Sequence, residues 1–427
     1  MADDRTSFRR WLAAAVGVGA VVRVAWLVDR WNAPIGFEDA FFYHHQANLL
    51  ADGHGFISPF PFLSSGISSP AAEHPPLYSL YLSVFSYLGG TSVGWHQIAT
   101  TLLGIGTVAL VALAARAAAG DRVGIVAGFV AALYPHLWYQ DGIVWAEAMA
   151  QATVALFLLV GFTYVRRPSA RTLAALGAAA ALAAMARTEL VLLLPLAVVP
   201  LALWTEPMPR RQQLRWAGIG LVAGIVVLLP WTAFNLSRFD RPTTLSSNLG
   251  LTLASANCDT TWYGPTIGYW DFTCAQAAGN RASLTGGDPS DVDAEARSEA
   301  LGYVGDHAGR LPAVLAARTM RTAGLWSPRQ QVELDVLEGR PTRVAQSGVT
   351  LWWATAACAV VGLVAMRRRG LPTWPAVASV LAMWLGVLTA FASTRYRASA
   401  EPAVVVLAAA GIVAMVDARA RARLRGR

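Results

Sequence analysis

The chain has 427 residues, of which 55% are hydrophobic and 14% are charged, and its mean hydropathy is +0.44. This composition is too apolar for a soluble protein of this length and predicts a polytopic membrane protein. The net charge of +8 rests on arginine alone, because the sequence contains no lysine. Schiff-base chemistry through lysine is therefore excluded, and any phosphate must be held by arginine, histidine or backbone groups.

Ten apolar runs are long enough, at about 20 residues each, to cross a bilayer. They lie near residues 11–31, 95–118, 122–139, 143–165, 170–186, 188–204, 215–234, 347–366, 371–392 and 400–417. Ten spans place every arginine cluster of the connections and termini on the cytoplasmic side. We expect one all-α domain, residues 1–427, in the inner (plasma) membrane with both termini cytoplasmic, and a first run that is retained rather than cleaved.

Two long connections then fall on the outer face, residues 32–94 and 235–348. The first contains an acidic, aromatic and histidine-rich stretch at 36–47 and a short apolar run at 77–88. That run is too short for a span, so we expect an interfacial or re-entrant helix. The second is polar in its first half and has helical composition over 291–325. These connections predict a layer of outer loops on one membrane domain.

Cys258 and Cys274 both lie in the second outer connection, where the compartment is oxidising. We expect a disulfide that closes this loop, which the chain-entropy model values at about 3 kcal/mol. The alternative is two free thiols. Cys358 lies within a predicted span and is interpreted as a packing residue.

Glu38 and Asp39 stand directly after the first predicted span, and two adjacent carboxylates at the mouth of a span are costly to keep there. The outer face offers no nucleotide sugars, so group transfer there commonly draws on lipid-linked donors. Such a site needs a carboxylate base, cations for the departing phosphate, aromatic and polar groups for a sugar, and an apolar groove.

The run Gly36-Phe37-Glu38-Asp39-Ala40-Phe41-Phe42-Tyr43, followed by Gly53-His54-Gly55-Phe56 and His74-Pro75-Pro76-Leu77-Tyr78, carries a family resemblance. It resembles the first outer loop of polyprenyl-phosphate-dependent glycosyltransferases of fold class C (GT-C), which include protein O-mannosyltransferases and lipid A aminoarabinose transferases. Abundant alanine and exclusive use of arginine suggest an actinobacterial-type member. Further matches, in order, are Pro135 with Glu147, Ala186-Arg187-Thr188-Glu189, Pro230-Trp231 with Asn235, Asn248-Leu249-Gly250 with Asn257, and Arg395-Tyr396-Arg397 before Pro402.

The resemblance implies that Asp39, four residues before Tyr43, is the catalytic base, with Glu38 as a helper or a helix-start acid. The alternative for the pair is N-capping and dipole compensation of a short helix, worth about 1 kcal/mol. The resemblance also implies substrate-binding positions, which are Tyr43, Glu147, Asn257 and Tyr396. Glu147 should be paired with an arginine such as Arg187.

Donor phosphate-binding residues follow from the same comparison and from arginines on the outer face, which need an anionic partner. The candidates are His74, Arg187, Arg238, Arg395 and Arg397. Many relatives carry an arginine where this chain has Phe234, and Arg238 or Arg241 is expected to replace it. The alternatives are a histidine that bonds the Pro75-Pro76 turn and arginines that pair with protein carboxylates.

Four aromatic residues of the second outer loop suggest a lid that stacks on a sugar, although an interfacial aromatic belt explains them equally well. They are Trp262, Tyr263, Tyr269 and Trp270. His44 and His45 invite a metal hypothesis, which we discount because adjacent helical residues point about 100° apart. No cofactor is required; a divalent metal is possible but not favoured, and we assign no metal ligand.

The predicted function is transfer of a sugar from a polyprenyl-phosphate donor to an acceptor hydroxyl on the outer face, with inversion and with Asp39 as general base. The acceptor is a cell-envelope glycan, lipid or protein, and no nucleic acid is involved. One alternative is a transporter or flippase for a lipid-linked sugar, which should show inverted repeats and broken helices. Another is a non-catalytic cell-envelope assembly subunit, in which Asp39 would be replaceable.

Overall fold

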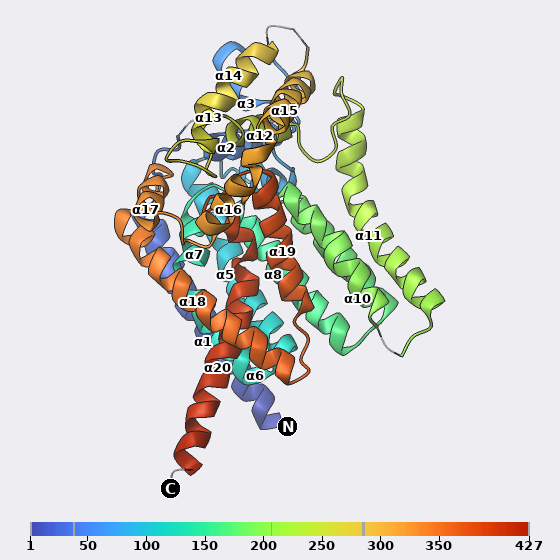
Figure 1. Cartoon of the computed structure of the whole chain (residues 1–427), viewed down its shortest axis with the longest axis vertical. Coiled ribbons are helices and arrows are strands. Elements are labelled where there is room, and N and C mark those ends of the chain that lie inside the picture. Colours follow the sequence, from blue (N-terminus) through green and yellow to red (C-terminus); the bar gives the residue numbers. More distant parts are fainter. Residues whose placement is uncertain (1, 37–38, 206, 284–286, 426–427) are drawn as a thin grey trace.

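The computed structural model describes residues 2–36, 39–205, 207–283 and 287–425. Throughout these ranges the regular elements are helices, apart from one isolated bridge between Ile57 and Pro70. The predicted all-α class is therefore confirmed. Figure 1 shows both termini at the lower end of the molecule and the helices of the second outer connection at the upper end.

Among the described residues, six helical segments are long and apolar enough to cross a membrane. They are Thr6–Asp29 within α1 (Ala2–Asp29), α5 (Val93–Ala119), α8 (Glu147–Arg166), α11 (Arg210–Leu236), α18 (Thr342–Arg368), and Tyr396–Leu424, which contains most of α20 (Glu401–Arg425). Three shorter apolar segments match further predicted spans. They are α9 (Ala170–Ala184), Thr188–Leu203, which consists of η2 (Thr188–Leu192), η3 (Leu194–Val198) and α10 (Val199–Leu203), and α19 (Trp374–Thr389).

The predicted run 122–139 does not form one helix. α6 (Asp121–Leu133) ends at Tyr134, whose backbone is extended, and α7 (Pro135–Trp138) and η1 (Tyr139–Gly142) follow. Pro135 explains the break, because a proline disfavours helical backbone in the preceding residue and lacks the N–H that would continue the helix. Hydropathy alone does not register this interruption.

The first outer connection folds into α2 (Asp39–Ala51), α3 (Pro59–Ser65) and α4 (Leu77–Tyr87). α4 has 11 residues, so it extends about 16 Å and cannot span the hydrocarbon core. It packs against α2 and α5, and its Tyr78 hydroxyl lies 2.6 Å from the Thr100 hydroxyl of α5. A short, non-spanning helix was the expectation for this run.

The second outer connection forms a helical layer. Its elements are α12 (Leu249–Ala256), α13 (Asp259–Trp262), α14 (Phe272–Ser283), α15 (Pro289–Asp306), η4 (Ala308–Arg310), α16 (Leu311–Thr322) and α17 (Pro328–Leu337). Small apolar clusters hold the layer together, one of them around the fully buried Trp262. The predicted disulfide is confirmed, since Cys258 and Cys274 are bonded.

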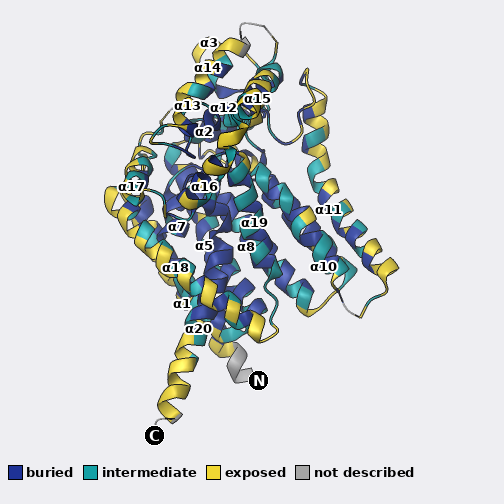
Figure 2. Cartoon of the chain, viewed as in Figure 1, coloured by how far each residue is buried: buried dark blue, intermediate teal, exposed yellow. Residues whose placement is uncertain are grey.

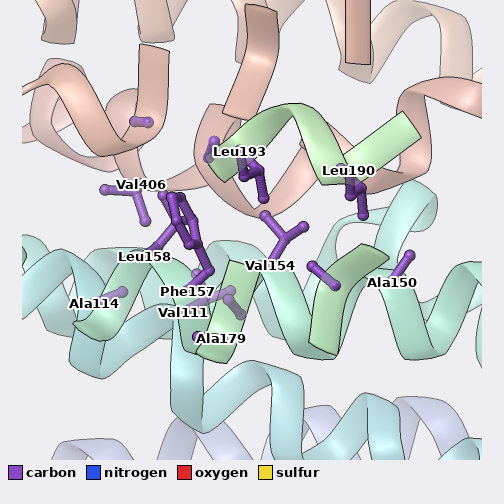
Figure 3. Close-up of a cluster of buried hydrophobic side chains, with 14 of the residues drawn as sticks. Val111, Ala114, Ala150, Val154, Phe157, Leu158, Ala179, Leu190, Leu193 and Val406 are labelled. Atoms are coloured by element: carbon purple, nitrogen blue, oxygen red, sulfur yellow. The ribbon is translucent and has the colours of Figure 1, made fainter. Parts of the chain in front are cut away.

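The main core lies between the central helices. Side chains of α5, α8, α9, η2 and α20 converge there, among them Val111, Phe157, Ala179, Leu190 and Val406 (Figure 3). Buried residues concentrate on α5 and α8, whereas α18 and the lower part of α20 are largely exposed (Figure 2). α18 and α20 approach closely where Gly362 faces Gly411, because a Cβ on Gly362 would lie 1.8 Å from the Leu407 carbonyl oxygen.

Candidate active site

Asp39 is the first residue of α2. One carboxylate oxygen pairs with the Nη2 of Arg395, and the other lies 3.4 Å from the Nε2 of His74. The side chain keeps 30% of its surface exposed. Its place in the first helical turn also favours an ionised carboxylate, because the helix dipole is positive there.

Arg395 lies in the turn between α19 and η5 (Tyr396–Ala400). Besides Asp39 it contacts Glu147, whose Oε1 accepts a hydrogen bond from its Nε, and its guanidinium stacks 4.0 Å from the centre of the Trp145 ring. Sequence reasoning missed Trp145. The available signal was its position two residues before Glu147, next to a residue already singled out.

Glu147 opens α8 and is fully buried. Its Oε1 also accepts from Arg187 Nη1 at 2.8 Å, so the predicted pairing with Arg187 is confirmed. Arg187 in turn donates to Glu189 at 2.6 Å and lies 4.4 Å from the centre of the Tyr396 ring. The second oxygen of Glu147, Oε2, is buried and has no hydrogen-bond partner among the residues that the structure describes.

These residues form one charge cluster, defined here as Asp39, His74, Glu147, Arg187, Glu189 and Arg395. Acids and bases alternate along it, so no carboxylate faces another without a guanidinium between them. The members come from α2, the loop before α4, the start of α8, the loop after α9, η2 and the turn before η5. A single site is thus assembled from distant parts of the sequence.

Opposing effects act on Asp39. Burial disfavours its charged form, but the Arg395 guanidinium and His74 outweigh burial and lower the pKa of Asp39 below its usual range. The carboxylate is therefore ionised at neutral pH while Arg395 holds it. In this state it is a weak base, and it would become a stronger one if Arg395 moved to another anion.

Aromatic side chains line the cluster beside His74. The Tyr43 ring lies 4.9 Å from the His74 ring and 5.0 Å from the Tyr78 ring, and the Phe42 ring lies 4.9 Å from His74. Burial, followed by the negative charge of Asp39, raises the pKa of Tyr43 well above its usual range. Tyr43 is thus a neutral hydroxyl next to the carboxylate.

Tyr43 and Tyr396 contact this cluster through His74 and Arg187, whereas three other predicted site residues lie away from it. Arg397 is buried and pairs with Glu401 at 2.6 Å, inside the helix bundle. Arg238 donates to the carbonyl oxygens of Phe56 and Ala71 and so joins the two outer connections. Asn257 accepts from Trp262 Nε1 at 3.1 Å within the helical layer. Glu38 lies outside the described residues.

The proposed aromatic lid needs correction. Trp262 is fully buried and Tyr269 is 4% exposed, so neither offers a free face to a sugar. Both serve as packing anchors of the helical layer because their rings fill its interior. A cavity of about 420 Å³ lies in the same layer between α12, α14 and α15, with Asn257 and Tyr303 in its wall and no member of the charge cluster.

His44 and His45 do not converge on one point. His44 Nδ1 lies 3.0 Å from His96 Nδ1, and the His45 ring packs 4.2 Å from the Phe41 ring. Within the described ranges, three carboxylates that could share a cation gather elsewhere, in the second outer connection; they are Asp240, Asp288 and Asp291. Arg241 already pairs with Asp291 there at 2.7 Å.

Residues 73–234 match the family model described as dolichyl-phosphate-mannose-protein mannosyltransferase. This range contains four members of the charge cluster, which are His74, Glu147, Arg187 and Glu189. By sequence, none of the curated proteins matches the chain.

The structure resembles the archaeal oligosaccharyltransferase AglB from Archaeoglobus fulgidus in complex with an inhibitory peptide and a dolichol-phosphate, with a TM-score of 0.55 and 12% identity over 98% of this chain and 52% of that chain. The apo form of the Archaeoglobus fulgidus enzyme gives a TM-score of 0.55 and 13% identity, over 97% of this chain and 52% of that chain. ArnT from Cupriavidus metallidurans bound to undecaprenyl phosphate gives a TM-score of 0.43 and 16% identity, over 94% of this chain and 77% of that chain.

The fold is therefore that of GT-C membrane proteins, and the chain spans about half the length of the oligosaccharyltransferase. Together with the family model, this fold confirms the resemblance to polyprenyl-phosphate-dependent glycosyltransferases of the GT-C class that the motifs of the sequence indicated.

Proposed function

We propose that the protein is a GT-C glycosyltransferase that moves a sugar from a polyprenyl-phosphate donor to an acceptor hydroxyl on the outer face of the cytoplasmic membrane. One observation carries the proposal. Asp39, the candidate base, shares Arg395 with the buried Glu147, so a base and a phosphate-binding cation meet at one point. The matched family model and the oligosaccharyltransferase described with a dolichol-phosphate support a lipid-phosphate donor.

The reaction is a single displacement. The acceptor oxygen attacks the anomeric carbon and forms the new glycosidic bond, while the bond from that carbon to the phosphate oxygen breaks. Asp39 takes the acceptor proton, and the polyprenyl phosphate leaves with the bonding electrons. Attack opposite the leaving group inverts the anomeric centre. Guanidinium groups hold the phosphate, so the scheme requires no cofactor.

Arg395 couples donor binding to the base in this scheme. A phosphate competes with Asp39 for the Arg395 guanidinium, because both are anions that accept from its fork of N–H donors. Once Arg395 turns to the phosphate, burial is no longer opposed by that cation, and the pKa of Asp39 rises. The base therefore gains strength when the donor is in place. Arg187 and His74 are the further candidates for phosphate contact.

The test is chromosomal replacement of Asp39→Asn in a strain that depends on the protein. We expect a polyprenyl-phosphate sugar to accumulate and one cell-envelope glycan, lipid or protein to lose a sugar substituent, as measured by lipidomics and glycan analysis. The control is Asp52→Asn, because Asp52 is exposed and lies directly after α2, the helix that Asp39 begins. Wild-type transfer in a normally inserted Asp39→Asn protein contradicts the proposal.

The same strain separates the rival functions. A flippase for the lipid-linked sugar would leave the accumulated donor in the cytoplasmic leaflet, whereas a blocked transferase leaves it in the outer leaflet. Periodate labelling of intact cells reports the leaflet, because the reagent reaches only exposed sugars. An assembly subunit predicts that Asp39→Asn has no chemical phenotype.

A further inference from the structure

The segment 391–396 carries two members of the site, Arg395 and Tyr396, but it has little regular structure of its own. Residues 391–393 are irregular, and a turn leads into η5. A connecting segment of this kind is mobile unless other elements hold it. Whatever fixes Arg395 in place must therefore come from outside the segment.

The disulfide-closed loop, residues 258–274, holds the first half of this segment. The Ala392 amide donates to the Gly268 carbonyl oxygen at 2.9 Å. The Trp270 ring packs 6.1 Å from the Phe391 ring, which in turn lies 4.7 Å from the Tyr396 ring. The loop thus touches the segment through both backbone and aromatic contacts.

A chain of hydrogen bonds continues from the loop to Arg395. The Tyr269 hydroxyl donates to Glu338 Oε1 at 2.7 Å, and the Ser393 hydroxyl donates to the same oxygen at 3.3 Å. The Ser393 hydroxyl oxygen then accepts the Arg395 backbone N–H at 3.1 Å. The oxygen of Glu338 thus joins the loop and the segment at one point.

A second anchor from α17 runs parallel to this chain. The Thr394 hydroxyl donates to Asp335 at 2.7 Å, and Asp335 is held by Arg340 at 3.0 Å. Both partners of that ion pair are buried. Residues 393, 394 and 395 therefore each have a polar contact that orients the turn.

We infer that the Tyr269–Glu338–Ser393 hydrogen-bond chain positions Arg395, and that the Cys258–Cys274 disulfide supports it by closing the loop that carries Tyr269. Tyr269 and Glu338 are positioning residues, because the contacts described for them do not include Asp39. The inference rests on the proposed function in one respect, namely that Arg395 holds the lipid phosphate.

Amide hydrogen exchange on the full chain in lipid nanodiscs tests the positioning without any substrate. Tyr269→Phe removes only the hydroxyl and keeps the buried ring, and we expect exchange over 391–397 to become about tenfold faster. Tyr303→Phe is the matched control, because its hydroxyl donates to Asp259 at 2.8 Å in the same layer. Glu338→Gln is the second variant if Tyr269→Phe folds poorly.

Exchange over 391–397 that stays at the wild-type rate in both Tyr269→Phe and Glu338→Gln overturns the inference. Reduction of the disulfide should also speed exchange over 391–397. If reduction speeds exchange only within 258–274, the part of the inference that concerns the disulfide is wrong.

Binding of undecaprenyl phosphate, used as the probe, ties the positioning to the site. We expect Tyr269→Phe to raise the Kd several-fold in the wild-type background and to leave it unchanged in an Arg395→Gln background. In such a double-mutant cycle, non-additive effects show that the two residues are coupled. Equal effects in both backgrounds indicate a merely structural role and overturn the inference.

The two failures are distinguishable. If Arg395→Gln itself leaves undecaprenyl phosphate binding unchanged, the phosphate role assigned to Arg395 in the proposed function is wrong. The exchange rates over 391–397 still decide whether Tyr269 and Glu338 position the segment.

Discussion

Two arginine–aspartate pairs of the same chemistry occupy opposite environments in this protein. Arg23 and Asp141 meet at 2.6 Å between α1 and η1, and both side chains are completely buried. Arg23 also donates to the Ala131 and Ala132 carbonyl oxygens of α6. Gly104 makes room for the pair, because a Cβ there would lie 1.9 Å from Asp141 Oδ2.

The Arg395–Asp39 pair is open in comparison. Arg395 is 18% exposed and Asp39 is 30% exposed, and the arginine divides its donors between Asp39 and Glu147. A closed pair has no route by which a ligand could replace one partner, and breaking it destabilises the fold because an uncompensated charge stays buried. A pair at the surface of a loop layer can exchange its protein partner for a phosphate. Accessibility, rather than charge, separates the structural pair from the candidate functional pair.

The largest expected effect is on transfer in Asp39→Asn. Loss of a general base lowers the rate by about 10²- to 10⁴-fold. The unfolding temperature should stay near that of the wild type, because the residue is partly exposed and the amide keeps its shape. Transfer measured with purified protein and a polyprenyl-phosphate sugar checks this. A loss of stability as large as the loss of activity would place Asp39 with the structural pairs.

The closed pair should respond in the opposite way. Gly104→Ala pushes a methyl group into Asp141 and should lower the unfolding free energy by about 3 kcal/mol, the lower range for breaking a buried pair. Gly106→Ala is the control, since a Cβ there meets nothing within 4 Å. Denaturant or thermal unfolding in detergent measures both. Transfer per folded molecule should be unchanged, and a selective loss of transfer would contradict the comparison.

The pH dependence sharpens the role of Arg395. The pKa of Asp39 is lowered in the folded protein, below an unfolded value of about 3.9. Its pairing energy is therefore fully present above that value and is lost only as the pH falls through the lower folded pKa. We expect Asp39 to cause no loss of wild-type kcat/KM between about pH 5 and 8, because kcat/KM reports the donor-free enzyme, in which Arg395 holds Asp39.

In Arg395→Gln, burial is opposed only by His74, so the pKa of Asp39 rises and the residual transfer should decline at a higher pH than in the wild type. A pH profile of transfer for both proteins measures the shift. Identical acid limbs would show that Arg395 does not control the charge of Asp39.

The smallest effect is expected at an exposed pair. Arg122 is 68% exposed and donates to Asp417 at 2.8 Å. Arg122→Gln should change the unfolding free energy by less than about 1 kcal/mol and leave transfer unchanged, because exposed ion pairs are screened by water and salt. A change above that limit would show that exposure is a poor guide to the energetic weight of these pairs.

Much of the fold follows from local properties of the sequence. Residues close together in the chain determine the apolar runs and the short helix α4. The disulfide depends on two nearby cysteines and on an oxidising compartment. The run 122–139 was predicted as one span but is not one helix, because Pro135 breaks the helix at Tyr134 and hydropathy averages over that proline. The lid prediction was wrong for Trp262 and Tyr269 for a related reason. Aromatic composition does not distinguish a buried ring from an exposed one, and Trp262 is a core residue.

The candidate site was predicted in part. Asp39, His74, Glu147, Arg187 and Arg395 were all singled out from the sequence, and the structure brings them into one cluster. Arg397 was grouped with Arg395 because the two flank Tyr396. Arg397, in η5, pairs with Glu401, whereas Arg395, in the turn before η5, pairs with Asp39, so sequence proximity did not imply a shared site.

The sequence by itself determined that this is a helical membrane protein with acidic and basic residues at the ends of its spans, because bilayer thickness and hydrophobic transfer act on each run separately. Only the tertiary structure decided which of those charges meet. Asp39 and Arg395 are 356 positions apart, and no local pattern specifies such a pairing. The packing of α2, α8 and η5 specifies it, because burying their apolar faces brings their polar ends to one point.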